Sequence, residues 1–384
     1  MVQWTGNMVH FSVGAPNEKR GLVAVAAHPV KLASAMRLEQ VDEPGAEWDE
    51  FVESATGGHL GHAAAWADVL RFAYGLFPHY LACRSDQGSL VGVLPLTRFR
   101  TLRGRRELVS IPFHDVAGIL CHSPEVGAAL LEGALELARR TRAAAVELRQ
   151  GPPQEWLPSL PATGPASRIN LVLALPGDEE ALWKALGAKV RNQVRKAEKE
   201  GLTLASWEPP ELLDGFYRCF AENMRDLGSP VHGRAFFGEM ARRFGARLRC
   251  FVAADGTRAV GGLVAIHHGA RVTVTWASTL RAERPRCPNH LIYWQALRWA
   301  VSLGATHFDF GRSPVDGGTH RFKLSWGARE EPLCWLRLAP TGEPQPIAHA
   351  GSDPVLSRLS ALWQRMPLGW SERLGPWLRR RLSN

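Results

Sequence analysis

The sequence predicts a mixed α/β (α+β) fold built from two similar units in tandem. The chain has 384 residues, and at roughly 150 residues per domain this length indicates two domains. A β-hairpin, a helix and one further strand follow one another twice, at residues 80–150 and again at 249–310. The Pro- and Gly-rich stretch 151–165 lies between them and is typical of an inter-domain connection. Chance similarity between two α/β stretches is the alternative explanation of the repeat.

From this organisation we expect four regions along the chain. They are a disordered extension or an overcalled start at 1–35, a first unit at 36–165, a second unit at 166–339 and a basic amphipathic tail at 340–384.

The composition excludes several classes of protein. A hydrophobic fraction of 45% is ordinary for a soluble globular protein and excludes a globally disordered chain. No stretch approaches the ~18 consecutive apolar residues that a spanning helix needs. The six cysteines occur singly, without a C-x-x-C pair, which argues against a zinc ribbon, an iron–sulfur site and a disulfide framework. We therefore expect a protein of the reducing cytoplasm.

In the first unit the pattern predicts four strands and two helices. Asp86-Gln87-Gly88 separates two apolar runs and indicates a hairpin turn. The expected elements are a strand at 36–41, a helix near residues 48–51, strands at 80–84 and 91–98, a helix at 124–140 and a strand at 145–150.

The second unit shows the same kinds of element. Asp255-Gly256 indicates a hairpin turn there as well. The expected elements are a strand at 169–175, two helices that separate near Gly187, strands at 249–253, 260–267 and 271–278, a helix at 289–302 and a strand at 307–310.

The helix that begins at residue 188 carries much of the scarce lysine. The formal net charge is +9, and only seven of the 46 basic residues are lysine, of which four lie between 184 and 199. Val190, Val194 and Ala197 form its apolar stripe. Because its polar faces hold almost only cations, we expect it to bind an anion such as phosphate, the alternative being a solvated face. The predicted contacts are Lys189, Arg191, Arg195 and Lys196.

Lys323 is the one lysine beyond residue 199. A strand at 307–310 precedes it and runs into the Gly-rich stretch 311–318. A Gly-rich loop exposes backbone N–H groups, so Arg312 and Lys323 together with this loop could fix an anionic group or a developing oxyanion. The alternative is that Asp309 and Arg312 form an ion pair that stabilises the fold.

The motifs of the second half resemble those of the FemAB-like proteins, in the branch found with exosortase (PEP-CTERM) and exopolysaccharide systems. The resemblance spans about 36–339. The residues that carry it are Lys-x-Arg-Asn-x-x-Arg-Lys-Ala-x-Lys-x-Gly-Leu at 189–202, Met-Arg-Asp-Leu-Gly-Ser-Pro-Val at 224–231, Phe236-Phe237, Pro-Asn-His-Leu-Ile-Tyr-Trp at 288–294, Phe-Asp-Phe-Gly-Arg-Ser at 308–313 and Phe-Lys-Leu-Ser-Trp-Gly at 322–327.

This resemblance implies two GNAT-type acyltransferase domains and an N-acyl transfer. In the better-known members of the family, an aminoacyl group passes from tRNA to the amine of a cell-wall precursor. Residues 281–290 lack the Gly-rich loop by which ordinary GNAT enzymes bind acetyl-CoA, so the donor stays open between aminoacyl-tRNA and acyl-CoA. The expected acceptor is a small-molecule, lipid-linked or nucleotide-linked anionic compound.

Acyl transfer to an amine needs a proton acceptor and a stabilised oxyanion. We expect Asp309 and Tyr293 to handle protons, with His290 and His320 as weaker candidates, and Lys323 to complete the catalytic set. Further substrate or phosphate contacts are predicted at Asn289, Gly311, Arg312 and Ser313.

Two His-containing segments of the first unit have simpler explanations. His114 and Asp115 either line the acceptor cleft or form a turn. His59-Leu-Gly-His62 supplies two imidazoles, whereas a metal site needs three or four ligands. We therefore expect no metal and explain this pair by the start of a helix.

The leading hypothesis is thus an N-acyltransferase acting on an amine of a cell-envelope or exopolysaccharide precursor. The alternative is a GNAT-fold protein without catalysis that serves such a system as a binding or scaffold module.

The tail predicts a contact with the inner face of the cytoplasmic membrane. Trp363, Trp370 and Trp377 are seven residues apart, and three arginines follow at 379–381. Tryptophan and arginine on an amphipathic segment suit an anionic interface. We expect peripheral association through 352–384, and a helix docked on the protein's own surface is the alternative.

Overall fold

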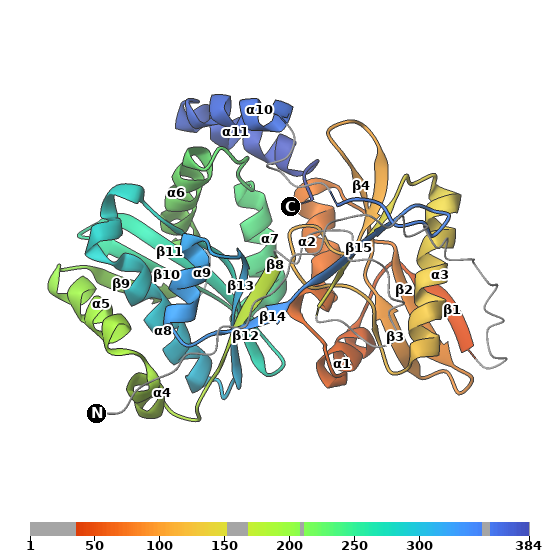
Figure 1. Ribbon diagram of the computed structural model, residues 1–384, viewed down its shortest axis with the longest axis horizontal. Coiled ribbons are helices and arrows are strands. Elements are labelled where there is room, and N and C mark those ends of the chain that lie inside the picture. The colour runs from red at the N-terminus through yellow and green to blue at the C-terminus, as the bar shows by residue number, and fades with distance from the viewer. Residues whose placement is uncertain (1–35, 152–167, 208–210, 348–353, 384) are drawn as a thin grey trace, which may run out of the picture.

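The computed structural model describes residues 36–151, 168–207, 211–347 and 354–383, which form three β-sheets with helices packed around them (Figure 1). The predictions made for 1–35, for most of the connection at 151–165 and for the start of the tail at 352–353 lie outside the described residues. The mixed α/β fold is confirmed.

Two small sheets make up the first unit. One has the order β1-β2-β3-β6 and is antiparallel throughout. Its strands are β1 (Met36–Val41), β2 (Tyr80–Ser85), β3 (Leu90–Leu94) and β6 (Leu120–Cys121). The other has the order β15-β7-β5-β4 and contains one parallel pair, β5 with β7. Its strands are β4 (Thr97–Arg100), β5 (Arg106–Val109), β7 (Val146–Gln150) and β15 (Cys334–Leu338).

Strand β15 links the two halves of the chain. It follows the second unit in sequence, yet all five of its residues pair with β7 in an antiparallel register. The expected limit at 339 assigns β15 to the second unit, whereas its hydrogen bonds lie in the first. The domain boundaries stay a prediction.

The second unit is organised on one seven-stranded sheet of order β14-β8-β13-β12-β11-β10-β9. Its strands are β8 (Arg168–Ala174), β9 (Thr203–Trp207), β10 (Leu248–Asp255), β11 (Arg258–His268), β12 (Arg271–Thr279), β13 (His307–Pro314) and β14 (Arg329–Pro332). Only β12 and β13 are parallel, and all other neighbours are antiparallel. A parallel pair needs a crossover, which α8 provides.

Helices cover the sheets of both units. In the first unit they are α1 (Ala46–Ser54), the 3₁₀ turn η1 (Leu60–His62), α2 (Ala65–Tyr74) and α3 (Pro124–Thr141). In the second they are α4 (Glu179–Ala185), α5 (Ala188–Lys199), α6 (Glu211–Asp226), α7 (Arg234–Phe244), the 3₁₀ turns η2 (Gly245–Arg247) and η3 (Arg281–Arg286), α8 (Pro288–Ser302) and α9 (Gly318–Ser325). The tail folds into α10 (Pro354–Gln364) and α11 (Leu368–Arg379).

Local sequence signals explain several of these boundaries. Helix α3 begins after Ser123, whose hydroxyl accepts the N–H of Val126, and Pro124 occupies its first turn, where no N–H is needed. Helix α5 buries the stripe of Val190, Val194 and Ala197, as its 3.6-residue period predicts.

The two faces of the large sheet have different neighbours. Helices α4, α5 and α8 cover one face and share a hydrophobic core with it. On the opposite face, α6 and α7 meet α1 and α2 of the first unit in a second core. Because this second core contains buried side chains from both halves, the halves pack as one body. A third core lies under α3.

The parallel strands β12 and β13 diverge inside the large sheet. They pair from Arg271–His307 to Thr273–Asp309 and no further, although β12 continues to Thr279 and β13 to Pro314. Beyond Asp309, a bulge shifts the register of β13 against β8 before Arg312. Gly311 lies in this bulge with φ +74°, a conformation that glycine adopts without steric cost. The divergence opens a gap in the sheet on the side of the first unit.

Candidate functional site

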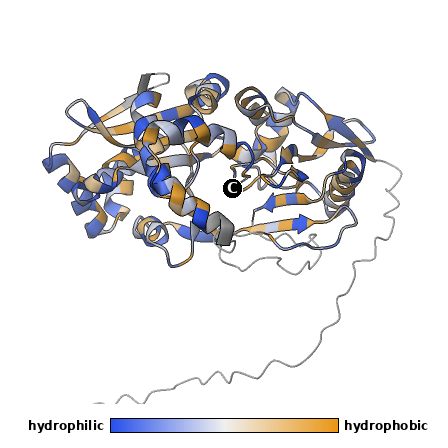
Figure 2. Cartoon of the chain, turned by 90° about the horizontal axis from the view of Figure 1, so that it is seen from above, coloured by the Kyte–Doolittle hydropathy of each residue, from blue (hydrophilic) through white to orange (hydrophobic). Residues whose placement is uncertain are grey.

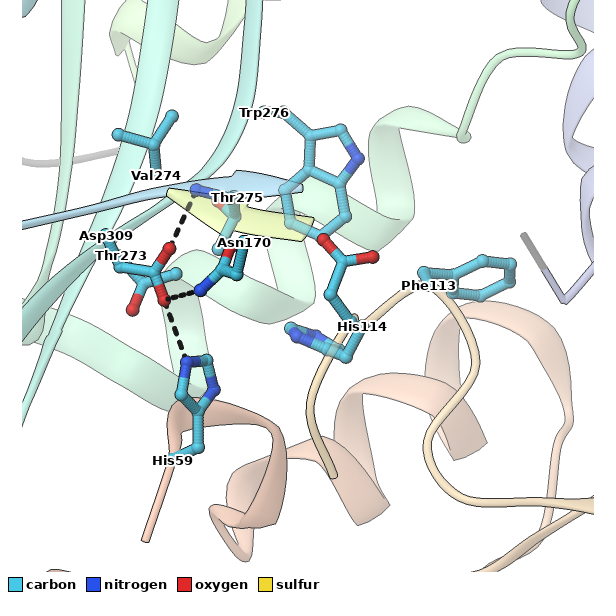
Figure 3. A pocket seen from close by; sticks show the side chains of 11 residues that line it. His59, Phe113, His114, Asn170, Thr273, Val274, Thr275, Trp276 and Asp309 are labelled. Carbon is cyan, nitrogen blue, oxygen red and sulfur yellow. Dashed lines mark hydrogen bonds and ion pairs between the residues drawn. The ribbon is translucent and has the colours of Figure 1, made fainter. Parts of the chain in front are cut away.

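A pocket lies where β12 and β13 separate and the first unit meets the sheet (Figure 3). Its cavity volume is about 30 Å³, enough for a water molecule or a small polar group. The lining residues come from η1, from the loop before β6 and from β8, β12 and β13: His59, Phe113, His114, Asp115, Asn170, Thr273, Val274, Thr275, Trp276, Asp309 and Gly311. The pocket is therefore a property of both units together.

Asp309 is the charged centre of this pocket. Its side chain is 1% exposed, and it accepts hydrogen bonds from His59 Nε2 at 2.9 Å, Asn170 Nδ2 at 3.0 Å and the N–H of Gly311 at 2.7 Å. Burial raises the pKa of Asp309, but the hydrogen bond and charge of His59, helped by Asn170 and Gly311, outweigh burial and leave the pKa below its ordinary value. Asp309 is therefore an acceptor-only carboxylate at neutral pH.

The ionised carboxylate fixes the tautomer of His59. Because a carboxylate only accepts, Nε2 of His59 must donate its proton to Asp309. In neutral His59 the lone pair is then on Nδ1. That atom is buried and has no hydrogen-bond partner among the described residues. A carboxylate-oriented imidazole with an unused ring nitrogen is suited to accept a proton from a bound substrate.

Other polar atoms of the pocket also lack partners within the described part of the chain. They are Nε2 of His114, Oδ1 of Asn170 and Oγ1 of Thr273, and all three residues line the pocket. Buried polar atoms are normally hydrogen-bonded, so several unsatisfied atoms around one cavity indicate a place for a polar ligand.

The loop from the first unit that borders the pocket is strained. Ile111 and Phe113 have backbone φ angles of +26° and +73°, which residues other than glycine rarely adopt. His114 packs on Trp66 with 4.1 Å between ring centroids. Burial, with the charges of His59 and Arg149, lowers the pKa of His114 to about 3, so its imidazole is neutral.

Arg312 and Asp309 do not form the ion pair considered above as an alternative. Arg312 Nε instead lies 3.2 Å from Oδ1 of Asp115 in the first unit, and its backbone N–H donates to the other carboxylate oxygen at 3.3 Å. The expectation that His114 and Asp115 line a cleft agrees with the pocket. The two carboxylates of the site thus each bind a partner in the opposite unit.

Lys323 lies behind the bulge of β13. Its ammonium donates to the carbonyls of Gly311 at 2.8 Å and Arg312 at 2.9 Å. Burial lowers its pKa to about 8, against the opposing effect of the Asp115 and Asp309 charges. Lys323 therefore supports the backbone beside the pocket, and its protonated form keeps one N–H beyond these two bonds.

The remaining predicted residues lie outside the pocket lining. Tyr293 belongs to the core on the other sheet face and stacks on Phe310, with 5.5 Å between ring centroids. Asn289 accepts a hydrogen bond from the Thr279 hydroxyl through Oδ1. Ser313 is 1% exposed, and its hydroxyl has no partner among the described residues.

The basic helix α5 is not part of the pocket lining either. Arg191 donates to the carbonyls of Trp183, Lys184 and Leu186 and so terminates α4. Arg195 lies over the Trp183 ring at 5.4 Å. The exposed Lys189 and Lys196 lie on the same helix, away from the pocket lining. A role of α5 in anion binding remains a prediction.

His59 is the residue that sequence reasoning missed. His59 does start a helix, since it caps η1 and its backbone N–H donates to Nδ1 of His62 at 3.2 Å, but the contact of its side chain with Asp309, 250 positions further along the chain, was not predicted. No local motif signals such a pairing. Within the described ranges, no group of three or more His, Cys, Asp or Glu side chains is arranged to hold a metal ion.

The segment between β12 and α8 does not fit the pyrophosphate of coenzyme A. In GNAT enzymes this segment offers free backbone N–H groups, whereas here the N–H groups of Glu283, Cys287 and His290 each bond to a carbonyl three residues earlier. Arg286 pairs with Asp255 and Glu283. The residues present therefore do not match the phosphate-binding loop of those enzymes.

Comparison with known proteins places the fold. Residues 186–324 match the family model described as an acetyltransferase (GNAT) domain. A search of curated proteins finds no match.

Similar solved structures extend the likeness over both units. The crystal structure of FemX has a TM-score of 0.62 at 16% identity, covering 77% of this chain and 95% of FemX. A tandem GNAT protein from the clavulanic acid biosynthesis pathway has a TM-score of 0.51 at 15% identity, and the match covers 79% of this chain and 98% of that protein. The C-terminal domain of a putative lysylphosphatidylglycerol synthetase from Agrobacterium fabrum has a TM-score of 0.50 at 14% identity, and the match covers 82% of this chain and 94% of that domain. The fold is thus that of two GNAT-type units in tandem.

Proposed function

We propose that the chain is an N-acyltransferase that forms an amide between an acyl or aminoacyl group and the amine of a cell-envelope or exopolysaccharide precursor. One observation carries the proposal: the buried Asp309–His59 pair faces a polar pocket at the point where β12 and β13 diverge. The similarity of residues 186–324 to GNAT acetyltransferase domains supports the acyl-transfer class.

The residues of the pocket suit the proton transfers of this reaction. The acceptor nitrogen attacks the acyl carbonyl carbon, a C–N bond forms, and the bond from that carbon to the donor's leaving group breaks. Nδ1 of His59 takes the proton that the nitrogen loses and returns it to the leaving group. Asp309 holds the ring in position and stabilises the imidazolium through Nε2–H.

Stabilisation of the oxyanion is assigned to Lys323 and the backbone of the bulge. The protonated amine of Lys323 keeps one N–H beyond its bonds to Gly311 and Arg312. Charge-assisted donors near a developing oxyanion lower the barrier most when the site excludes water. Lys323 lies outside the lining itself and acts from behind the bulge, and Tyr293, Asn289 and Ser313, which also lie outside the lining, remain predictions.

An aminoacyl donor is favoured over acyl-CoA. The closed turn at 281–290 offers no cradle for a pyrophosphate. One of the similar structures is the C-terminal domain of a putative lysylphosphatidylglycerol synthetase, and the product in that name is an aminoacylated lipid. The motif resemblance described above supports an exopolysaccharide or exosortase system in the cytoplasm as the setting.

A screen by thermal shift tests this function. Wild-type protein is exposed to acyl-CoA, aminoacyl-tRNA and nucleotide-linked sugars, and transfer is then measured with the compounds that stabilise it. We expect Asp309→Asn and Lys323→Ala to abolish transfer while both variants keep the wild-type circular dichroism. Transfer at the wild-type rate in both variants would reject the catalytic account in favour of the scaffold alternative.

The tail supports a second proposal, that the protein binds an anionic membrane surface. Helices α10 and α11 carry five exposed large apolar side chains: Leu359, Leu362, Trp370, Leu374 and Trp377. Arg358, Arg365 and Arg373 are exposed on or directly beside the same helices. Their positive charges complement anionic headgroups. Figure 2 shows apolar and polar residues side by side along them. Among the described helices, none is long and apolar enough to cross a membrane.

Flotation with liposomes tests the membrane proposal. We expect wild type to float with vesicles containing phosphatidylglycerol, and the double variant Trp370→Ser, Trp377→Ser to stay in the soluble fraction. Leu303→Ser removes an exposed apolar residue outside the tail, with 42% exposure against 59% for Trp370 and 51% for Trp377, and serves as the control. Equal flotation of all three proteins would contradict a membrane role of this face.

A further inference from the structure

The end of the tail docks at the rim of the pocket. Helix α11 lies over α6 and leads toward the junction of the two units (Figure 1). The carbonyl of Ser383 accepts the backbone N–H of Phe113 at 2.9 Å and Nη2 of Arg149 at 2.8 Å. Phe113 itself lines the pocket. Two donors of the first unit therefore converge on one oxygen of the tail.

One of these donors, Arg149, belongs to a group of three guanidinium side chains. Arg149 and Arg312 both lie over the ring of Trp335, with 4.5 Å and 5.0 Å from the guanidinium carbon to the ring centroid. Arg379 of the tail lies over the ring of Phe113 at 5.0 Å. Burial, together with the nearby charges of Arg149 and Arg312, lowers the pKa of Arg379 to about 10. The three cations are thus close enough to affect one another's pKa. Glu147 and Asp115 pair with Arg149 and Arg312, and Arg149 contacts the Ser383 carbonyl.

Arg149 is held rigidly in this position. It is 1% exposed, its Nε and Nη2 bind Glu147 at 3.1 Å and 3.0 Å, and its Nη1 binds the His114 carbonyl at 2.8 Å. The Nε and Nη2 edge of Arg149 is taken by Glu147, and its Nη2 and the Phe113 N–H converge on one further oxygen, that of Ser383. Two converging donors of this kind can bind a carboxylate or phosphate oxygen in its place.

We propose that Arg149, Arg312 and the N–H of Phe113 form an anion-binding subsite at the rim of the pocket, and that residues 379–383 are a tethered occupant which an anionic group displaces. The ligand chemistry is a phosphate or a carboxylate oxygen of a substrate. The assignment of that ligand as a substrate group rests on the proposed function, but the competition between anion and tail does not.

The tail is attached through a contact that a single substitution can break. Gly375 of α11 packs against Val231, and an added Cβ would lie 2.7 Å from the Val231 side chain and 3.0 Å from its backbone N and O. Gly369 on the same helix has no atom within 4 Å of an added Cβ. Gly375→Val should therefore detach α11, whereas Gly369→Val changes the same residue type on the same helix without a clash.

The test measures binding of inorganic pyrophosphate and of succinate by calorimetry at constant ionic strength, in wild type and both glycine variants. In wild type an anion can bind only the fraction of molecules whose subsite the tail has left. Detaching the tail makes every molecule available, so the apparent affinity for the anion rises by the inverse of that fraction. We expect Gly375→Val to bind one of the two anions about tenfold more tightly than wild type and Gly369→Val. The stronger anion identifies phosphate or carboxylate as the chemistry, and adding Arg312→Gln should abolish the gain.

Hydrogen exchange in the unmodified chain provides a second measurement that requires no variant. Saturating pyrophosphate or succinate should speed amide exchange in residues 377–383. Equal affinities in all three proteins, or exchange in the tail that neither anion changes, would overturn the proposal. Because neither measurement uses turnover, the subsite can fail while acyl transfer stands, and transfer can fail while the subsite stands.

Discussion

At the scale of single residues, the site depends on charges that the fold buries and then satisfies. Asp309 at 1% exposure would be too costly to ionise without partners. Its carboxylate is satisfied by His59 from the first unit and by Asn170 and Gly311 from the second. Arg312 lies close to Asp309 in sequence, but it pairs with Asp115 instead. The Asp309 carboxylate is therefore available to hold the ring of His59. The observed pairing makes His59 the proton acceptor of the account.

The pKa of Lys323 leads to a prediction about the pH dependence of the rate. Two N–H groups of Lys323 bind carbonyls, so only its protonated form retains a third for an oxyanion. Since its pKa is lowered to about 8, kcat should fall as the pH rises through about 8. Lys323→Arg stays protonated in this range, so whatever activity it keeps should show no such fall. An identical decline in both proteins would contradict the role of Lys323.

At the scale of elements, the bulge of β13 creates the site. The parallel pairing with β12 ends at Asp309, and Gly311 then turns its N–H back to the Asp309 carboxylate at 2.7 Å. This conformation needs φ +74°. The same bulge directs the carbonyls of Gly311 and Arg312 to Lys323. One local irregularity therefore positions two of the three predicted catalytic groups, Asp309 and Lys323.

A pair of glycine substitutions tests the bulge. Gly311→Ala should cost about 1–2 kcal/mol of unfolding free energy, because an L-residue is strained at positive φ, and should also reduce kcat at least tenfold. Gly304, at φ +71° and with no atom within 4 Å of an added Cβ, provides the control. Gly304→Ala should show a similar loss in urea denaturation with full activity, and equal activity of the two variants would argue against the bulge.

The sequence could predict elements but not the contacts between them. Apolar periodicity and turn residues placed β1 at Met36–Val41, the apolar stripe of α5 and the strand that carries Asp309. It did not predict β9, β14 or β15, which are short or separated from their partners by long stretches. The pairing of His59 with Asp309 spans 250 positions, and periodicity contains no information at that distance. Positive charge on α5 favoured anion binding, whereas Arg191 terminates α4.

At the scale of the whole molecule, the two units share a core and a site. Buried side chains of α1 and α2 pack with those of α6 and α7, and the pocket is lined from both sides of this junction. Strand β15 and the end of α11 return to the first unit. A change in the packing of one unit on the other should therefore alter the distance between His59 and Asp309, and with it the activity.

Buried imidazoles predict how the stability of the whole molecule depends on pH. Burial lowers the pKa of His62 and His114 to about 3 and that of His268 and His290 to about 4. The unfolded chain binds these protons below about pH 6.5 and the folded chain does not, so the free energy of unfolding should fall as the pH drops from 6.5 to 4. Each histidine contributes a slope of at most about 1.4 kcal/mol per pH unit.

Urea denaturation at several pH values measures this dependence. His290→Phe removes one of the four groups and keeps an aromatic ring beside Trp326, on which His290 stacks. Its free energy of unfolding should fall less steeply between pH 6.5 and 4 than that of wild type. Parallel curves for the two proteins would contradict the assignment.

The most direct test of the account is a double-mutant cycle of kcat/KM for acyl transfer, with the donor and acceptor that the ligand screen identifies. His59→Gln and Asp309→Asn should each lower kcat/KM by about 10²–10⁴-fold, the usual range for general acid–base catalysis. Because the two residues act as one unit, the losses should not multiply. The kcat/KM of the double variant should lie within a few-fold of that of the slower single variant. Single variants within threefold of wild type, or losses that multiply fully in the double variant, would contradict the account.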